Sequence, residues 1–145
     1  MIALIQRVNW VKLSIDNKPH SETGRGLLLL LGIEKDDDLV AGEKLLNKVL
    51  AYRVFPDDEG RMNLSLSDIE GDLMLVSQFT LAADTTKGLR PGFSTAMPPA
   101  DAEPLYEQLL QLAGEKHGRV ESGKFGANMQ IALENDGPVT FSLRC

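Results

Sequence analysis

A chain of 145 residues is long enough for one domain with a hydrophobic core, and we expect a single domain over residues 1–145. Its net charge of −6, from 15 basic and 21 acidic residues, argues against extended binding along a nucleic-acid duplex, so no DNA partner is expected. No window approaches the roughly 18 apolar residues that cross a membrane, and the N-terminus lacks a signal-peptide pattern. We therefore expect a cytoplasmic protein without a membrane partner.

Residues that bind metals or act as thiol nucleophiles are few and scattered. The single cysteine, Cys145, is the last residue, so it cannot form an internal disulfide and is a poor nucleophile candidate. His20 and His117 stand in polar stretches without a second His or Cys at ligand spacing. The sequence therefore predicts no metal site and no cofactor.

The first part of the chain predicts strands followed by a helix. Residues Ile2–Val8 are rich in β-formers, and the alternation of apolar and polar residues over Val11–Ile15 predicts a second, half-buried strand. A hairpin turn fits Asn17–Lys18, and the apolar run Leu27–Gly32 predicts a central strand. The aspartates just before Leu39–Tyr52 offer N-caps to a helix whose apolar residues recur at helical spacing.

The second part predicts a strand over Asp72–Thr80, after a turn at Pro56–Gly60. The stretch Leu81–Pro99 is irregular and long for a loop, and such loops inside compact domains are usually functional. We expect Asp101 to cap a helix over about Ala102–Ala113. Short strands close the chain, over Val120–Gly123, Met129–Glu134 and Val139–Leu143.

The resulting order is β-β-β-α-β-α-β-β-β, with a dense turn signal at Asn135–Pro138 between the last two strands. This order predicts an α/β layered domain in which a largely antiparallel sheet carries two helices. A dinucleotide fold is not expected, because the chain has neither a Gly-x-Gly-x-x-Gly motif after a strand nor a P-loop.

Two segments carry groups that suit catalysis, although each has an ordinary structural interpretation. Ser77–Thr80 lies at a strand end, where side chains and N–H groups are available to a ligand. A nucleophilic Ser77 or Thr80 would require a base, and none lies nearby in the sequence. Gly137–Pro138 is either a tight turn or a functional element, since X-Pro bonds are cis in only about 5–6% of cases.

Two further segments suit the binding of a nucleotide. Lys124–Gln130 places small residues between an aromatic ring and a thioether, and it either lines a shallow adenine pocket or packs into a core. The loop Leu81–Ser94 contains Lys87 and Arg90, which are either phosphate contacts or ordinary solvated cations.

In their order, these segments resemble the signature segments of the bacterial D-aminoacyl-tRNA deacylases, which are also called D-tyrosyl-tRNA deacylases. The segments that carry this resemblance are Ser77–Leu81, Arg90–Ser94, Gly123–Gln130 and Asn135–Thr140. Further similar stretches are Met1–Val8, Leu29–Asp37, Tyr52–Phe55 and Arg61–Leu64. The resemblance runs from the first residue to the last and implies a deacylase-like fold.

The resemblance also implies a homodimer with two active sites at the subunit interface. Each site would combine the catalytic segment of one subunit, Ser77, Gln78, Phe79 and Thr80, with a cis Gly137–Pro138 of the other. The implied substrate is the aminoacyl ester on the 3′-terminal adenosine of tRNA. D-aminoacyl-tRNA, and glycyl-tRNA mischarged on tRNA-Ala, would be hydrolysed, whereas Gly-Pro would reject any L side chain sterically.

The remaining roles that the resemblance implies concern the chemistry and the pocket. Backbone N–H groups near Phe79 and Thr80 would form an oxyanion hole, and the ribose 2′-OH of the tRNA would assist a water. A covalent Thr80 is the rival mechanism. Substrate-binding residues would be Phe125, Met129, Ala96 and Arg7, and local cations would be Lys87, Arg90 and Lys124.

Two other functions remain open from the sequence. One is a non-catalytic dimer that binds an RNA end or a nucleotide in the same pocket. The other is a small-molecule esterase with Thr80 as the nucleophile.

Overall fold

A six-stranded sheet forms the frame of the computed structural model, which describes residues 1–86 and 88–144. Lys87 and Cys145 therefore lie outside the described residues. The strand order is β2-β1-β3-β6-β7, and β8 lies off this path and also pairs with β1. The strands of this sheet are β1 (Ile2–Ile15), β2 (Lys18–Thr23), β3 (Gly26–Gly32), β6 (Asp72–Ser77), β7 (Val120–Ser122) and β8 (Met129–Arg144).

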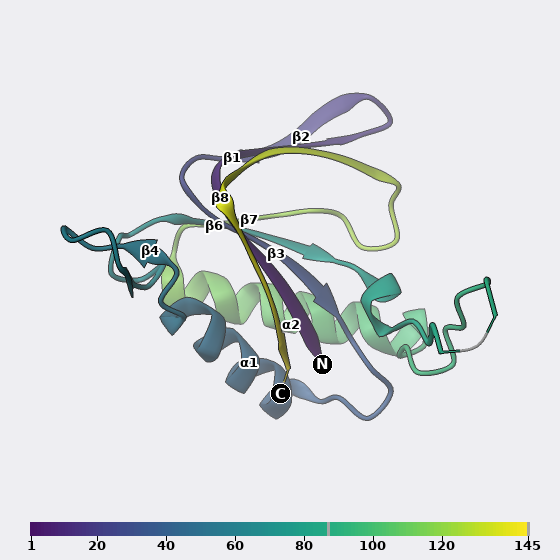
Figure 1. Cartoon of the computed structure of the whole chain (residues 1–145). Helices are drawn as coiled ribbons and strands as arrows, with labels where there is room; N and C mark the ends of the chain where they lie inside the picture. Colours follow the sequence, from purple (N-terminus) through teal and green to yellow (C-terminus); the bar gives the residue numbers. More distant parts are fainter. Residues whose placement is uncertain (87, 145) are drawn as a thin grey trace.

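The remaining elements are short or helical. Strands β4 (Phe55–Pro56) and β5 (Met62–Leu64) form a small separate hairpin. Helices α1 (Leu39–Ala51) and α2 (Pro99–His117) lie on the same side of the main sheet (Figure 1). A 3₁₀ turn, η1 (Phe79–Ala82), follows β6. None of the helices in the described part of the chain combines the length and the apolar composition that crossing a membrane requires.

Strand directions confirm the predicted α/β class with a largely antiparallel sheet and two helices. Strand β1 pairs antiparallel with β2, β3 and β8, whereas β6 runs parallel to both β3 and β7. Leu31 of β3 lies beside Ser77 of β6, and Leu75 of β6 lies beside Ser122 of β7. The carboxyl ends of these three strands therefore meet at one edge of the sheet.

The leucines of β3 divide the apolar core between the two faces of the sheet. Leu27, Leu29 and Leu31 belong to a cluster with residues of both helices, which we call the helix-side cluster. On the opposite face is the outer cluster of Val8, Val11, Leu13, Leu28, Met74 and Val76. This division follows from the two-residue period of a strand, and it explains why β3 is apolar on both faces.

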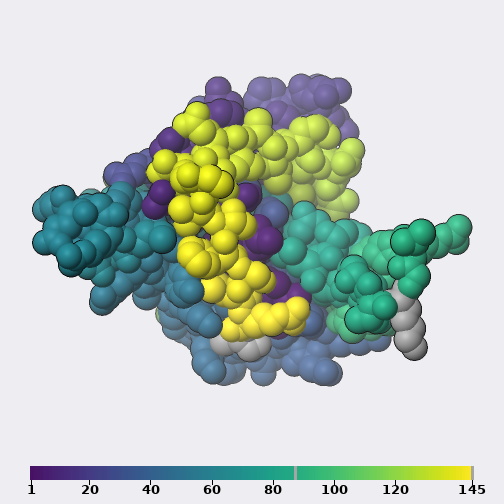
Figure 2. Space-filling view, in the orientation of Figure 1, coloured from purple at the N-terminus to yellow at the C-terminus, as the bar shows by residue number. Residues whose placement is uncertain are grey.

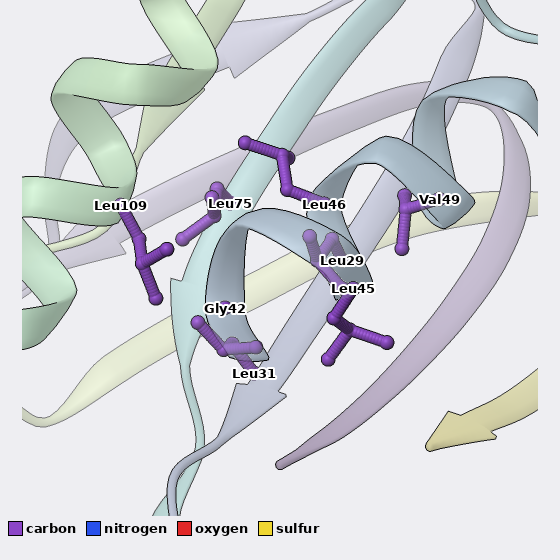
Figure 3. Close-up of a pocket in the computed structure, with 8 residues that line it drawn as sticks. All are labelled: Leu29, Leu31, Gly42, Leu45, Leu46, Val49, Leu75 and Leu109. Carbon is purple, nitrogen blue, oxygen red and sulfur yellow. The ribbon is translucent and has the colours of Figure 1, made fainter. Parts of the chain in front are cut away.

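A small void remains in the helix-side cluster, where α1 crosses the sheet close to α2 (Figure 3). Its volume is about 10 Å³, and apolar side chains such as Leu29, Leu75 and Leu109 line it. A space of this size and polarity suits at most one water molecule and no substrate.

The prediction of separate strands in two places is wrong. Strand β1 is continuous through Asn9–Trp10, and β8 is continuous through Asn135–Pro138, where the turn residues predicted a reversal. The chain does not reverse because the stretches before and after Asn135–Pro138 both pair with β1. In Figure 2 the last residues of the chain, in yellow, cross the face of the molecule that is in view.

Other element boundaries also differ from the predictions. Asp38 caps α1 as expected, accepting from the Ala41 N–H at 2.8 Å. The cap predicted at Asp101 is wrong, because α2 begins at Pro99 and continues to His117. Proline suits a first helical position, since its fixed φ is compatible with the helix and its missing N–H needs no partner there. Strand β6 ends at Ser77 because η1 begins at Phe79, and the β4–β5 hairpin was not predicted.

Candidate active site

The predicted catalytic segment Ser77–Thr80 lies at the exposed carboxyl edge of β6. The Gln78 N–H donates to Leu31 O at 2.7 Å, which holds the start of the segment on β3. The chain then turns through η1, which leaves Phe79 and Thr80 exposed, while Ser77 and Gln78 are half-buried. The structure therefore places these four residues together and within reach of solvent.

The N–H groups of Phe79 and Thr80 point to a role for the backbone. Within the described part of the chain, neither N–H donates to a protein group. Such unpaired donors are typical of the first residues of a helix. Two neighbouring N–H groups without partners are available to an oxygen that carries negative charge.

Among the described residues, no base contacts the hydroxyl groups of the segment. Thr80 Oγ1 accepts a hydrogen bond from Gln78 Nε2 at 2.6 Å, which is a donor and cannot take a proton from it. Among residues 1–86 and 88–144, no His, Lys or carboxylate hydrogen-bonds to the Ser77 or Thr80 hydroxyl. This arrangement does not favour a side-chain nucleophile.

The last part of β6 is held by hydrogen bonds from α2 and from the residue after β7. The buried Tyr106 hydroxyl of α2 donates to Leu75 O at 3.0 Å, and the Gly123 N–H donates to the same oxygen at 3.2 Å. Burial, and to a smaller extent the charge of Glu107, raises the pKa of the Tyr106 phenol, so it remains a neutral donor. These bonds hold β6 two residues before Ser77.

The long loop before α2 contributes Ala96, which is buried at the base of the loop. The loop is bound to the end of β3 by two hydrogen bonds, Lys35 N–H to Thr95 O and Met97 N–H to Ile33 O, both 3.0 Å. The Thr95 hydroxyl also hydrogen-bonds to Ala82 O in η1. These bonds hold Thr95, the residue before Ala96, on Ala82, two residues after Thr80.

The Gly137–Pro138 peptide is cis, as the sequence resemblance implies, and it lies in a bulge of β8. Four residues of β8, numbers 136–139, lie opposite the single residue Arg7 of β1. Asn135 closes this bulge by accepting from the Val139 N–H at 2.7 Å. Both Gly137 and Pro138 are exposed at its tip.

Arg7 holds the bulge from the side of β1, and its side chain is only 12% exposed. Its Nε donates to Asp136 O at 2.9 Å and lies 3.3 Å from Asp136 Oδ2. Its Nη1 donates to Val54 O at 2.6 Å. The guanidinium therefore links the residue before Gly137 to the start of the β4–β5 hairpin.

Gly137 is required by its surroundings. Its φ is +139°, and an added Cβ would lie 2.6 Å from Val139 Cγ2 and 3.2 Å from Arg7 Nη2. Any L side chain would therefore be both strained and crowded at this position.

The structure does not bring all predicted site residues together in one chain. No hydrogen bond or ion pair joins Gly137–Pro138 to the segment Ser77–Thr80 among the residues described. Phe125 packs on Tyr106 in the helix-side cluster, with ring centroids 5.8 Å apart, whereas Met129 packs against the outer cluster. Phe125 and Met129 therefore belong to different clusters.

Three neighbours of the site were not assigned a role from the sequence. Val54 and Asp136 hold Arg7, and Phe93 packs on Phe79 with ring centroids 5.0 Å apart. The backbone carbonyl of Val54 leaves no sequence signal. Phe93, by contrast, belongs to the signature segment Arg90–Ser94.

Two further observations concern other possible sites in the described chain. An open hollow of about 490 Å³ lies between the β1–β2 hairpin and Glu121 of β7, and none of the predicted site residues lines it. In the described residues, no group of three or more His, Cys, Asp or Glu side chains is placed to hold a metal ion.

Solved structures share this fold over nearly the whole chain. A structure of the c-Myc DNA unwinding element binding protein is 37% identical, with a TM-score of 0.96, and the match covers 100% of this chain and 99% of that one. A structure described as a probable eukaryotic D-amino acid tRNA deacylase has a TM-score of 0.83 and covers 98% of both chains. At 19% identity, the second likeness concerns the fold alone.

Sequence relatives define the family. The family described as D-Tyr-tRNA(Tyr) deacylase matches residues 4–144. D-aminoacyl-tRNA deacylases of Pseudomonas fluorescens (strain Pf0-1) and Pasteurella multocida (strain Pm70) are each 54% identical, over 99% of both chains. The chain belongs to the D-Tyr-tRNA(Tyr) deacylase family. This membership confirms the family and the enzyme class predicted from the ordered motifs.

Proposed function

We propose that this chain hydrolyses the ester between a D-amino acid and the 3′-terminal adenosine of tRNA. The observation that carries the proposal is the full-length match to relatives named D-aminoacyl-tRNA deacylase. Phe79 and Thr80 are exposed, and their N–H groups have no partner among the described residues, which supports an ester site at the carboxyl edge of β6. The activity belongs in the cytoplasm, where tRNA is aminoacylated.

The hydrolysis uses a water molecule and no protein nucleophile. Water attacks the ester carbonyl while its proton passes to the ribose 2′-oxygen and the 2′-OH passes its own proton towards O3′; the N–H groups of Phe79 and Thr80 stabilise the oxyanion. The carbonyl carbon–O3′ bond then breaks, and O3′ receives a proton. An aminoacyl ester is labile, so transition-state stabilisation on the order of a few kcal/mol suffices.

A homodimer completes each site. Gly137 and Pro138 are exposed at the tip of a bulge and make no hydrogen bond to Ser77–Thr80 of their own chain among the described residues. A partner subunit is therefore the source of the Gly-Pro that contacts the substrate. Two identical sites related by a twofold axis are the usual result of such an exchange.

Gly137–Pro138 selects for chirality as a steric wall. Arg7 and Asn135 fix the bulge, so it does not yield to an incoming side chain. An L side chain would point into this wall whatever its identity, whereas a D side chain would point away from it. Glycine has no side chain, so glycyl-tRNA mischarged on tRNA-Ala is also a substrate.

The direct test is to incubate the protein with D-Tyr-tRNA and with L-Tyr-tRNA and to measure release of the amino acid. We expect rapid hydrolysis of the D-ester and little of the L-ester. If neither ester, or both equally, were hydrolysed, the proposal would fail. Binding without turnover would instead favour the alternative of a non-catalytic RNA-end-binding dimer.

Subunit exchange tests where the Gly-Pro comes from. Thr80→Pro removes one N–H of the oxyanion hole, and Gly137→Val fills the crowded position of the bulge. Each variant alone is expected to be inactive. In an equilibrated 1:1 mixture half of the dimers are mixed, and each of these has one intact site of two if the Gly-Pro comes from the partner. The activity of the mixture therefore recovers to about a quarter of the wild-type value. No recovery in verified mixed dimers would contradict the shared site.

A duplex-binding function is less well supported. The name of the 37% identical solved structure refers to DNA binding by that protein. This chain has a net charge of −6, which disfavours many phosphate contacts along a duplex.

A further inference from the structure

Phe79 and Phe93 form an exposed aromatic pair beside the candidate active site. Their ring centroids are 5.0 Å apart with an interplanar angle of 58°. Phe79 is 59% exposed and Phe93 is 41% exposed, although both are large apolar side chains. Apolar surface of this kind next to a site usually marks the place where a ligand or a partner binds.

The backbone around Phe93 is held in place. Asp84 and Gly92 exchange two hydrogen bonds, of 2.7 and 2.9 Å, across the base of the projecting part of the loop. The Ala96 N–H donates to Phe93 O at 3.2 Å on the other side. These hydrogen bonds hold the backbone on both sides of Phe93. The described part of the loop between η1 and α2 projects from the body of the molecule (Figures 1 and 2).

A cation lies close to the aromatic pair in the sequence. Arg90 is exposed and lies three residues before Phe93, and it forms no ion pair within the described residues. The nearest acid in the loop, Asp84, accepts hydrogen bonds from the Thr86 N–H and hydroxyl, which lower its pKa. Aromatic rings beside an available guanidinium are the usual means of binding unpaired RNA.

We propose that the Phe79–Phe93 pair stacks a base of the unpaired nucleotides just before the terminal adenosine, with Arg90 at their phosphates. This inference rests on the proposed function, which places the terminal adenosine at Ser77–Thr80. Phe79 belongs to that segment, so the nucleotides that precede the terminal adenosine would lie beside the Phe79 ring. A tRNA ends in the unpaired sequence CCA, so cytosine bases are available to stack there.

The experiment compares two analogues in which an amide replaces the labile ester. One is 3′-D-tyrosylamino-3′-deoxyadenosine, and the other is the same nucleoside preceded by two cytidylates. For the wild-type protein we expect the longer analogue to bind about tenfold more tightly in a calorimetric titration. Phe93→Leu should remove this difference, whereas Phe93→Tyr, which keeps the aromatic ring, should preserve it.

Two further variants sharpen the comparison. Trp10→Leu removes another exposed aromatic ring, 37% exposed on β1, and should leave the preference for the longer analogue unchanged. Arg90→Gln should lower the salt dependence of binding for the longer analogue by roughly one phosphate contact and leave that of the nucleoside unchanged.

Several results would overturn the inference. One is a wild-type protein that binds both analogues equally or binds neither. Another is a preference that survives in folded Phe93→Leu, or an equal loss for both analogues. Dissociation of the Phe93→Leu dimer in sedimentation would assign the pair to the subunit contact instead. Wild-type hydrolysis of D-Tyr-tRNA, measured in parallel, shows separately whether the proposed function holds.

Discussion

At the scale of single residues, the hydroxyl of Thr80 separates two mechanisms. It accepts from Gln78 Nε2 and has no base, whereas its backbone N–H is unpaired within the described chain. We expect Thr80→Ala, which keeps the N–H, to retain kcat/KM for D-Tyr-tRNA within about threefold. A loss of a thousandfold or more would instead support a covalent threonine.

A complementary substrate change tests the other half of this mechanism. Replacement of the terminal adenosine by its 2′-deoxy form removes the proposed assisting hydroxyl, so hydrolysis should slow strongly. An unchanged rate would argue against assistance by the RNA.

Arg7 is the residue on which the geometry of Gly137–Pro138 depends. Its planar guanidinium donates to Asp136 O and Val54 O at once, and a lysine ammonium does not reproduce this fork. Arg7→Lys should therefore lower kcat/KM for D-Tyr-tRNA about tenfold or more, and reduce the free energy of unfolding by about 1–3 kcal/mol.

Arg53 provides the matched control for this substitution. It is exposed and adjacent to Val54, so Arg53→Lys should leave both the activity and the stability nearly unchanged. Equal effects of the two substitutions would contradict the assigned role of Arg7.

At the scale of elements, α1 approaches α2 closely at Gly42 (Figure 3). A Cβ at this position would lie 2.5 Å from Leu109 Cδ2 and 2.9 Å from Leu109 Cδ1. The adjacent void of about 10 Å³ is too small to absorb this displacement. Overpacking costs about 1–3 kcal/mol and the gain in helix propensity returns about 1 kcal/mol, so Gly42→Ala should lose up to about 2 kcal/mol in urea unfolding.

Gly114 in α2 is the matched control, because an added Cβ there meets nothing within 4 Å. Gly114→Ala should stabilise the protein by about 0.5–1 kcal/mol through helix propensity alone. If both variants changed stability in the same direction, the close contact of the helices would not be the cause.

At the scale of the whole molecule, a cluster of ion pairs joins the two ends of the described chain to each other and, through Glu34, to the loop between η1 and α2. The Met1 ammonium lies 2.9 Å from Glu34 Oε2 and 2.6 Å from Asp37 Oδ1, and Arg144 lies 3.3 Å from Glu34 Oε1. Glu34 in turn forms a β-bridge with Ala96. A substitution that breaks these ion pairs should therefore lower the free energy of unfolding and also loosen the loop between η1 and α2.

The cluster predicts how stability depends on pH. The hydrogen bond from the Met1 ammonium lowers the pKa of Glu34 below its ordinary 4.5, so this stabilisation is present above pH 4.5 and is lost as pH falls. Burial opposes the charge of the ammonium, but hydrogen bonds to Asp37 and Glu34 raise its pKa above 8.0. That contribution is present below pH 8.0 and is lost as pH rises through the raised pKa.

Glu34→Gln tests the acid side of this dependence. At pH 7 we expect a loss of about 1–2 kcal/mol in the free energy of unfolding, because a charged hydrogen-bond partner is removed. The difference from wild type should shrink towards pH 3, where the glutamate is itself protonated. A difference that does not change with pH would mean that packing, and not charge, is responsible.

Much of the fold could be predicted because its signals are local. The leucine run of β3 and the Asp38 cap of α1 depend only on residues a few positions apart. The proposed catalytic segment comes from ordered motifs, which likewise require no knowledge of the contacts. By itself, the sequence determined the α/β class and the family, and it is the source of the proposed site residues.

The tertiary structure alone decided how distant segments pair. Residues 135–138 predict a reversal locally, yet β8 continues without reversing because β1, more than a hundred residues away, pairs with it on both sides of the bulge. Arg7 on Asp136 and Phe93 on Phe79 are likewise contacts between separate segments. The physical reason is that packing and hydrogen bonding between distant segments outweigh the local turn preference. Neither of these interactions can be predicted from the spacing of residues along the sequence.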